Sequence, residues 1–406
     1  KLKDHVINVK TRDEISALAE TVNQMTMGLV KAAVANKDLT VGKEVQKMFI
    51  PLEVGSDGTK KTTGREETEK VSFFGYYEGA KGVSGDYFDF RKLDDKHYAM
   101  IKCDVAGKGV PASLIMVEVA TIFLNYFRSW SLEKDGIQLD QLVYSFNDLL
   151  EERGFKGRFA ALIVMILNVE SGALHMCNAG DNLVHIYDGQ QNRMIEKVLP
   201  ESPAAGVFPS MLVEMQNPYK QIPYTLKRED ILMLFTDGME EAQRFFRNSD
   251  FEKILCDAEG LQEGEQHYNH QFKSEFEELG LERIEGILDA VNNRERYTLI
   301  KYHNPVSDEE LTFDFSTCQG TAEESVLALV AVEKIFRMVP DPSAGPDDKI
   351  QVDRRVNEFL KKHFEQYRMY FRNEEKQEEG SDYITFTHIK EDEQYDDLTL
   401  LAIKRH

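Results

Sequence analysis

The pattern of apolar and polar positions predicts two kinds of element along this chain. Apolar residues recur three and four positions apart near the N-terminus and in several later segments, which is the spacing of one helical face. Elsewhere, short and nearly continuous apolar runs lie beside aspartate and glycine, and such runs are typical of buried strands. Strands, then helices, then strands follow one another, so the sequence predicts an α+β fold.

The first helical segment begins at a capping-like start, Thr11 to Glu14, and continues with a regular apolar seam. The seam consists of Ile15, Leu18, Val22, Met25 and Leu29. This spacing predicts a coiled coil, although an amphipathic helix packed on its own domain would have the same spacing. The pattern becomes irregular after Ala33, which indicates a stutter in the coil. It resumes at Val41, Val45, Met48 and Leu52, and Pro51 is expected to end the helix. The next residues, Glu53 to Lys70, are rich in Gly, Thr, Lys and Glu and are predicted to form a mobile loop.

Four predicted strands each lie next to an aspartate. The run from Val71 to Tyr77 leads to Asp86, and the run from Tyr98 to Cys103 is followed directly by Asp104. Two more runs behave in the same way: Ile231 to Phe235 precedes Thr236-Asp237-Gly238, and Asp396-Asp397 precedes Leu398 to Ile403. A single Asp-Gly after a strand is usually only a turn. Four such strand ends could instead bring four carboxylates together.

Other segments have a clear helical or strand pattern. Helices are expected at Ala112–Trp130 and Leu139–Arg153, a hairpin at Phe159–Asn168 with Ala173–Cys177, and a continuation of this meander at Asn182–Tyr187. Between Arg244 and Ser381 the expected elements are helices at Phe272–Val291, Glu323–Val339 and Val352–Phe371, a hairpin of Tyr297–Tyr302 with Leu311–Phe315, and a loop at Pro340–Asp348.

Composition narrows the function classes. The chain has 406 residues, 42% of them hydrophobic, so it is long enough for at least one domain with a proper core. Its formal net charge of -22 disfavours nucleic acid and anionic lipid as partners and favours a carboxylate-rich site for divalent cations. The four scattered cysteines, Cys103, Cys177, Cys256 and Cys318, are expected to be reduced and mostly buried in a cytoplasmic protein. We find no run of about 18 apolar residues and no signal peptide, so we expect the polypeptide as given to be soluble.

Five motifs together point to one family. GDYFDF, DVAGKGVPASLIM, NAGDNL, LFTDGMEEA and DDLTLLAI resemble, in this order, the motifs of the type 2C metal-dependent protein phosphatases, and in particular the bacterial sporulation stage II E-like branch. The resemblance covers roughly residues 71 to 243 and the final dozen. Two positions depart from the family pattern: Lys108 replaces the usual histidine, and Ser84 replaces a common glycine. Neither departure removes a metal ligand.

The resemblance implies a fold, a cofactor and a set of ligands. The fold would be an antiparallel β-sandwich with helices on both outer faces. The cofactors would be two divalent cations, Mn²⁺ or Mg²⁺, because all-oxygen ligation suits hard cations. Asp104 would bridge both metals, Asp86 would hold the second, and Asp237 and Asp396 would hold the first. The carbonyl of Val105 is a further candidate ligand, and Asp89 and Asp397 are candidates for supporting positions behind the ligands, with direct ligation as the alternative.

The N-terminal segment has a resemblance of its own. DEISALAETVNQM is similar to the second helix of a HAMP domain, with Ser16 and Val22 in place of the usual glycine and phenylalanine, and KEVQKMFIP is similar to the helix that precedes many bacterial phosphatase domains. A HAMP helix implies a parallel homodimer and an upstream membrane segment that is absent from this chain. The expected organisation is therefore a partial HAMP helix (1–33), a connecting helix and loop (34–70), and a phosphatase domain (71–406) with an insertion within 244–381.

Together these features predict a function. We expect a metal-dependent serine/threonine phosphatase, the cytoplasmic part of a membrane-anchored protein, regulated through its N-terminal helix. Its expected substrate is a phosphorylated signalling protein, of the kind that antagonises an anti-sigma factor. The alternative is a non-catalytic signalling module that binds a partner through the same fold. A cysteine phosphatase motif, a P-loop and an HExxH motif are all absent, and His175 and His185 are predicted to be structural.

Overall fold

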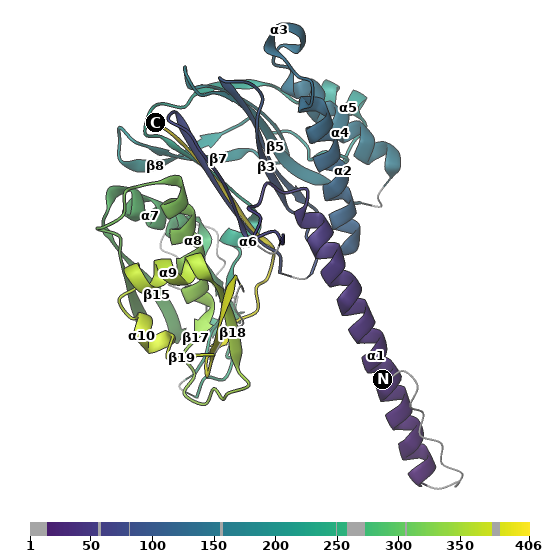
Figure 1. The fold of residues 1–406 in the computed structure, drawn as a ribbon, viewed down its shortest axis with the longest axis vertical. Helices are drawn as coiled ribbons and strands as arrows, with labels where there is room; N and C mark the ends of the chain where they lie inside the picture. The colour runs from purple at the N-terminus through teal and green to yellow at the C-terminus, as the bar shows by residue number, and fades with distance from the viewer. Residues whose placement is uncertain are drawn as a thin grey trace.

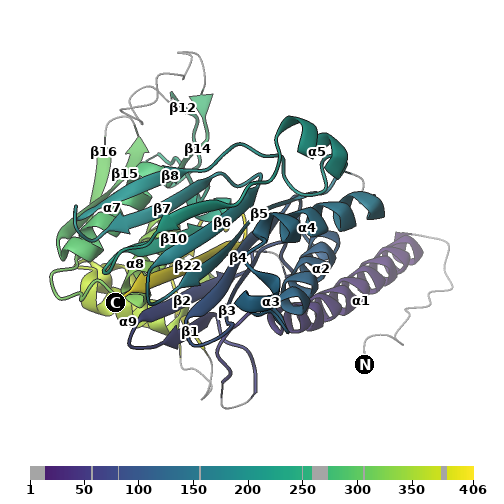
Figure 2. The same ribbon diagram turned by 90° about the horizontal axis from the view of Figure 1, so that it is seen from above.

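A computed structural model of the protein describes residues 14–55, 58–80, 82–154, 157–248, 250–257, 273–304, 307–375 and 382–406. Two antiparallel sheets form its centre, and Figure 2 shows them as adjacent layers with helices on both outer sides. The six-stranded sheet has the order β1 (Thr63–Glu67), β2 (Val71–Glu78), β22 (Leu398–Arg405), β10 (Ile231–Phe235), β7 (Leu183–Asp188), β8 (Arg193–Val198). The five-stranded sheet has the order β3 (Tyr87–Lys92), β4 (His97–Val105), β5 (Ala160–Asn168), β6 (Ala173–Ala179), β9 (Ile222–Thr225).

The continuous apolar runs are explained by burial on both faces of the six-stranded sheet. In β10, Leu232 and Leu234 belong to the core between the two sheets. Met233 and Phe235 point the other way, into a second core beneath the outer helices. Successive side chains of a strand alternate between its faces, so a strand that is covered on both sides needs apolar residues at every position. The β-sandwich expected from the family resemblance is therefore the observed architecture.

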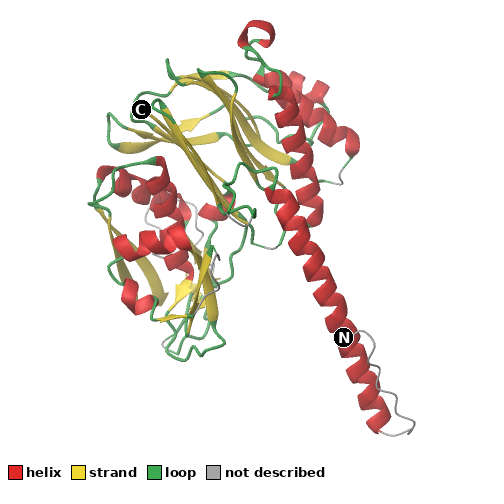
Figure 3. Ribbon diagram, viewed as in Figure 1, coloured by secondary structure: helices red, strands yellow, loops and turns green. Residues whose placement is uncertain are grey.

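Helices cover both outer faces (Figure 3). The five-stranded sheet is covered by α2 (Val110–Phe127) and α4 (Leu139–Arg153), with α3 (Leu132–Asp135) and α5 (Ser210–Gln216) beside them. The six-stranded sheet is covered by α7 (Gly280–Asn293) and α8 (Ala322–Arg337). By length and composition α2 could also cross a membrane. One of its faces, which includes Ile115, Val119 and Phe123, is fully buried in the core between helices and sheet, as in a core helix.

A single helix, α1 (Glu14–Lys47), extends away from the body of the protein (Figure 1). It is continuous through the region where the apolar pattern changes phase. Of the predicted seam, Val22, Met25, Val41, Val45 and Met48 are all exposed, with 36–68% of each residue accessible. Leu52, the last predicted seam position, is instead buried in the core of the body and cannot belong to an exposed seam. The side chains of Ile15, Leu18 and Leu29 lie outside the described part of the structure, as does the capping-like start before Glu14.

The chain between β10 and β22 forms a set of small elements around α7 and α8. These are α6 (Asp237–Glu240), β11 (Gln243–Phe245), β12 (Cys256–Asp257), β13 (Lys273–Ser274), β14 (Phe276–Glu278), β15 (Arg296–Asn304), β16 (Ser307–Asp314), β17 (Met338–Val339), β18 (Lys349–Asp353), α9 (Arg354–His363), α10 (Tyr367–Tyr370), β19 (Asn373–Glu374), β20 (Tyr383–Thr387) and β21 (Lys390–Glu391). The predicted hairpin in the insertion is present as β15 and β16, which pair antiparallel. Residues 258–272 lie outside the described ranges.

Four predictions about the elements differ from the structure. The predicted loop Glu53–Lys70 contains the edge strand β1, whose polar sequence gives little strand signal because one of its sides is open. The predicted helix Phe272–Val291 begins only at Gly280, because β14 pairs with β11 and a buried Arg244–Glu277 ion pair of 2.8 Å holds that pairing.

The predicted helix Val352–Phe371 is also wrong in its extent. Its first two residues belong to β18, and the Asp353 carboxylate accepts a hydrogen bond from the Arg355 amide at 2.8 Å, which caps α9. The meander also breaks: β6 pairs within the five-stranded sheet, whereas β7 pairs with β10 and β8 in the other sheet. Gly180, at a φ of 73°, lies in the connection where the chain changes sheets.

Candidate active site

The predicted ligands meet in one cleft at an end of the sandwich. Asp86, Asp104, Asp237 and Asp396 all line this cleft of about 270 Å³. Asp104 comes from β4 of the five-stranded sheet, and Asp86 immediately precedes β3 of the same sheet. Asp237 follows β10, and Asp396 precedes β22, both in the six-stranded sheet. The cleft therefore depends on both sheets being packed together.

Close approach of the backbone requires glycine at two positions beside these aspartates. A Cβ on Gly85 would lie 2.7 Å from the Val105 carbonyl oxygen, and one on Gly238 would lie 2.0 Å from the Asp397 carbonyl oxygen. Any side chain would push these segments apart. The Gly-Asp and Asp-Gly pairs in the sequence are therefore needed for packing as well as for turns.

The carboxylates repel one another strongly in the absence of a cation. Burial, and then the charges of Asp237 and Asp396, raises the pKa of Asp104 to about 7. Burial, and then the charge of Asp104, raises the pKa of Asp86 well above its ordinary value. Burial and the charge of Asp396 also raise the pKa of Asp237. Clustered carboxylates of this kind fit hard divalent cations, which would remove the repulsion and supply the missing positive charge.

Supporting contacts fix two of these carboxylates in place. The Thr236 hydroxyl donates to Asp86 at 2.6 Å, which joins the loop before β3 to the end of β10. Asp397 also lines the cleft, and its carboxylate accepts a hydrogen bond from the Ala80 amide at 2.8 Å. Asp89, the other candidate for a supporting position, does not line the cleft. Its carboxylate is buried on β3, where it accepts a hydrogen bond from the Tyr87 hydroxyl at 2.8 Å.

Lys108, the departure from the family pattern, lies at the edge of the cleft. Its ammonium group forms a 2.8 Å ion pair with Asp396 and lies 4.2 Å from the centre of the Tyr395 ring. The ammonium group therefore contacts one of the candidate ligands directly. Val105, whose carbonyl is a further candidate ligand, is also among the residues that line the cleft.

Sequence reasoning missed two cationic side chains that organise this region. Lys102 forms a 2.7 Å ion pair with Asp181 and donates to the Phe235 carbonyl at 2.8 Å, so it ties the two sheets together next to Asp237. Arg158 donates to the Ala106 carbonyl at 3.2 Å and so holds the loop after Asp104. Asp181 belongs to the NAGDNL motif, so the sequence does mark this aspartate as a candidate residue of the site. Its partner Lys102 lies in an apolar strand and matches no motif, so the sequence alone does not point to it.

A β-sandwich that carries a cluster of aspartates at one end is the arrangement that the resemblance to type 2C metal-dependent phosphatases implies. Residues 94–284 match the family model of stage II sporulation protein E (SpoIIE). The match covers just under half of the chain, and in this part the chain resembles a SpoIIE-type serine/threonine phosphatase domain. The family match includes Asp104 and Asp237, whereas Asp86 and Asp396 lie outside its bounds.

Relatives in other organisms are similar over the same part of the chain. Phosphoserine phosphatase RsbU of Bacillus subtilis is 26% identical over 179 residues, which cover 43% of this chain and 49% of that protein. Protein IcfG of Synechocystis sp. is 23% identical over 275 residues, which cover 59% of this chain and 40% of that protein. The chain spans less than half the length of these curated relatives.

Solved structures of phosphatase domains are also similar. The PP2C domain of SiaA from Pseudomonas aeruginosa has a TM-score of 0.47 at 13% identity, covering 92% of this chain and 98% of that chain. RsbX in complex with magnesium has a TM-score of 0.41 at 13% identity, covering 85% of this chain and 100% of that chain.

Proposed function

We propose that this protein hydrolyses phosphoserine or phosphothreonine in a signalling protein, with two divalent cations, Mn²⁺ or Mg²⁺, held by the aspartate cleft. The observation that supports this most is the convergence of Asp86, Asp104, Asp237 and Asp396 from two different sheets. A partner-binding module without catalysis would have no need to gather four mutually repelling carboxylates in one cleft, which is costly.

The residues of the cleft have separable roles in this proposal. Bound there, the cations would supply an activated water and neutralise charge on the phosphate oxygens. Asp104 would hold both cations, Asp237 and Asp396 one of them, and Asp86 the other. Thr236 would keep the Asp86 carboxylate oriented towards the cleft, because its hydroxyl donates a hydrogen bond to one of the two carboxylate oxygens.

Activity of purified protein on an aryl phosphate, with and without Mn²⁺, tests the proposal. We expect Asp104→Ala and Asp237→Ala each to lower turnover at least about 100-fold, because each removes a carboxylate that positions the cations. Asp95→Ala is the matched control, since its side chain is 97% exposed on the turn between β3 and β4. If either cleft variant turns over substrate at the wild-type rate with metal bound, the assignment of these ligands is wrong.

The substrate class is proposed from the relatives, two of which are named phosphoserine phosphatases. We expect a phosphorylated anti-sigma-factor antagonist from the same host to be dephosphorylated, as followed by phosphate release and by loss of the phosphoserine mass. The Asp104→Ala protein is the negative control. Cleavage of aryl phosphate without cleavage of any phosphorylated antagonist would contradict the substrate and leave the catalytic proposal standing.

We also propose regulation through α1 and a parallel homodimer formed along its exposed apolar seam. The contact that supports regulation is direct. The Gln46 side chain accepts a hydrogen bond from the Ser84 amide at 2.9 Å and donates one to the Ser84 carbonyl. Ser84 lies two residues before Asp86, so the end of α1 holds the segment that carries a candidate metal ligand. The HAMP-like origin of α1, the upstream membrane segment and the cytoplasmic location belong to the same proposal.

A further inference from the structure

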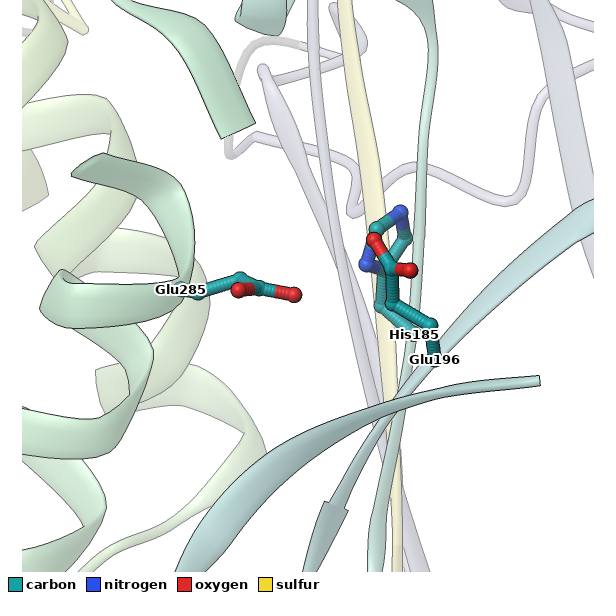
Figure 4. Close-up of side chains that lie close together, drawn as sticks. All are labelled: His185, Glu196 and Glu285. Atoms are coloured by element: carbon teal, nitrogen blue, oxygen red, sulfur yellow. The ribbon is translucent and has the colours of Figure 1, made fainter. Parts of the chain in front are cut away.

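A second group of possible metal ligands lies on the face of the six-stranded sheet that α7 covers, outside the aspartate cleft. His185 of β7 and Glu196 of β8 are directly opposite each other in the strand register. Both lie on the sheet face that α7 covers, and Glu285 of α7 points across to them (Figure 4). The three side chains therefore come from three different elements and meet where those elements pack.

The geometry of these three groups suits one ion. One ligand atom from each of His185, Glu196 and Glu285 lies within 4.8 Å of the other two. Two ligands of a tetrahedral zinc ion lie about 3.4 Å apart, since Zn–N and Zn–O bonds are each about 2.0–2.2 Å long. Glu196 is exposed and can rotate, so its side chain can close the remaining difference of up to about 1.4 Å between the ligand atoms.

His185 provides an independent indication of a ligand. Only 5% of the residue is exposed, yet its Nδ1 atom has no hydrogen-bond partner among the described residues. The ring is held in place by stacking on Phe235, with the ring centres 4.7 Å apart. Burial, and then the charge of Lys102, lowers the pKa of His185 to about 4, so the imidazole is neutral at pH 7. Neutral imidazole is the form that binds metal ions, and a buried ring nitrogen without a partner is otherwise costly.

The surrounding charge also favours a cation. Burial, and then the nearby carboxylates of Glu196 and Asp289, raises the pKa of Glu285. The Asp289 carboxylate, one helical turn further along α7, already accepts a hydrogen bond from the Met194 amide at 2.5 Å. Glu196 and Glu285 are thus left facing each other beside a neutral histidine. A bound divalent cation would turn their repulsion into attraction.

We propose that His185, Glu196 and Glu285 bind a Zn²⁺ ion, separate from the cations of the aspartate cleft. One nitrogen and two oxygen ligands select a borderline metal such as zinc over Mg²⁺, because imidazole is a poor ligand for magnesium. Three protein ligands and an exposed Glu196 leave a fourth position for water. The ion would fasten the β7–β8 hairpin to α7, which packs against the short helix α6 that begins at Asp237.

Zinc binding to the whole chain tests this site. The protein is stripped of metal, kept in excess Mg²⁺, and dialysed against Zn²⁺, and the bound zinc is counted by elemental analysis. We expect the wild-type protein to bind one more equivalent of zinc than Glu285→Gln and Glu196→Gln, and zinc to raise the thermal unfolding midpoint of the wild type only. Glu282→Gln, on the exposed first turn of the same helix, is the matched control and should behave like the wild type.

Two further measurements separate this site from the aspartate cleft. Asp104→Ala should lose zinc from the cleft only and keep the equivalent that depends on Glu285. Replacing zinc by Co²⁺ should give visible absorption bands that disappear in Glu285→Gln. If Glu196→Gln and Glu285→Gln fold normally by circular dichroism and bind as much zinc as the wild type, or if the wild type binds no equivalent beyond the cleft, the proposed site does not exist.

Discussion

At the scale of single residues, Lys108 stands out because it contacts a candidate metal ligand. Its ammonium group pairs with Asp396 at 2.8 Å, and the ion pair raises the pKa of the lysine, so the charge is present at neutral pH. A positive charge this close opposes the binding of a divalent cation to the same carboxylate. The histidine that the family usually has at this position would be largely neutral at pH 7. Lys108 should therefore set a higher metal requirement for this protein.

Removing that charge should strengthen metal binding. We expect Lys108→Met to lower the Mn²⁺ concentration for half-maximal phosphatase activity by about threefold to tenfold, as removal of one nearby charge at intermediate dielectric implies. Mn²⁺ titrations of activity on an aryl phosphate measure the effect. Lys92→Met, whose side chain pairs with the exposed Asp95 at 3.1 Å away from the cleft, is the control. An unchanged or higher Mn²⁺ requirement in Lys108→Met would show that this lysine does not compete with the metal.

At the scale of elements, the buried strands and their aspartates were predictable, and the edges were not. Strands β2, β10 and β22 coincide with the predicted runs to within two residues, because burial on both faces leaves few positions for polar side chains. The four aspartates followed from those strand ends, and the structure brings them together. Edge strand β1 is polar, so its sequence predicts a loop and not a strand. The positions of Lys102 and Thr236 in the site depend on contacts between strands distant in sequence, which no local pattern encodes.

Helix α1 should act on the cleft through its hold on Ser84. Inserting residues between Leu29 and Val41 rotates the two halves of the helix relative to each other by about 100° per residue. We expect phosphatase activity to rise and fall with the number of inserted residues, and a four-residue insertion, close to one full turn, to behave most like the wild type. In a Gln46→Ala background the dependence on phase should be weaker, because the hydrogen bonds to the Ser84 backbone are lost.

Activity and assembly are measured on the same insertion series. Steady-state rates report the effect on the cleft, and sedimentation reports dimerisation along the seam. If the chains dimerise and every insertion gives the same rate, α1 is a passive tether and the regulatory proposal is wrong. The same proteins without the segment before Val41 give the rate of the unregulated domain.

At the scale of the whole molecule, two cores share one sheet. The first core lies between the two sheets and under α2 and α4, and the second lies between the six-stranded sheet and α7, α8 and α9. The elements of the predicted insertion contribute to the second core, with Leu299 of β15 and Leu311 of β16 fully buried in it. Composition could not show this, because the same apolar residues would suit a separate domain. The packing follows from pairing across the sheet, which the sequence of one segment does not reveal.

The central place of β22 has a consequence for the order in which the protein is made. This strand lies between β2 and β10, and Asp396 and Asp397 stand at its start, yet all three of its partners in the site are synthesised long before it. While the ribosome is still adding the residues between Glu240 and Asp396, the six-stranded sheet has a gap at its middle and the cleft lacks one wall. On the proposed function, we therefore expect a nascent chain to be inactive until β22 has been inserted, so that the topology delays activity until this strand is made.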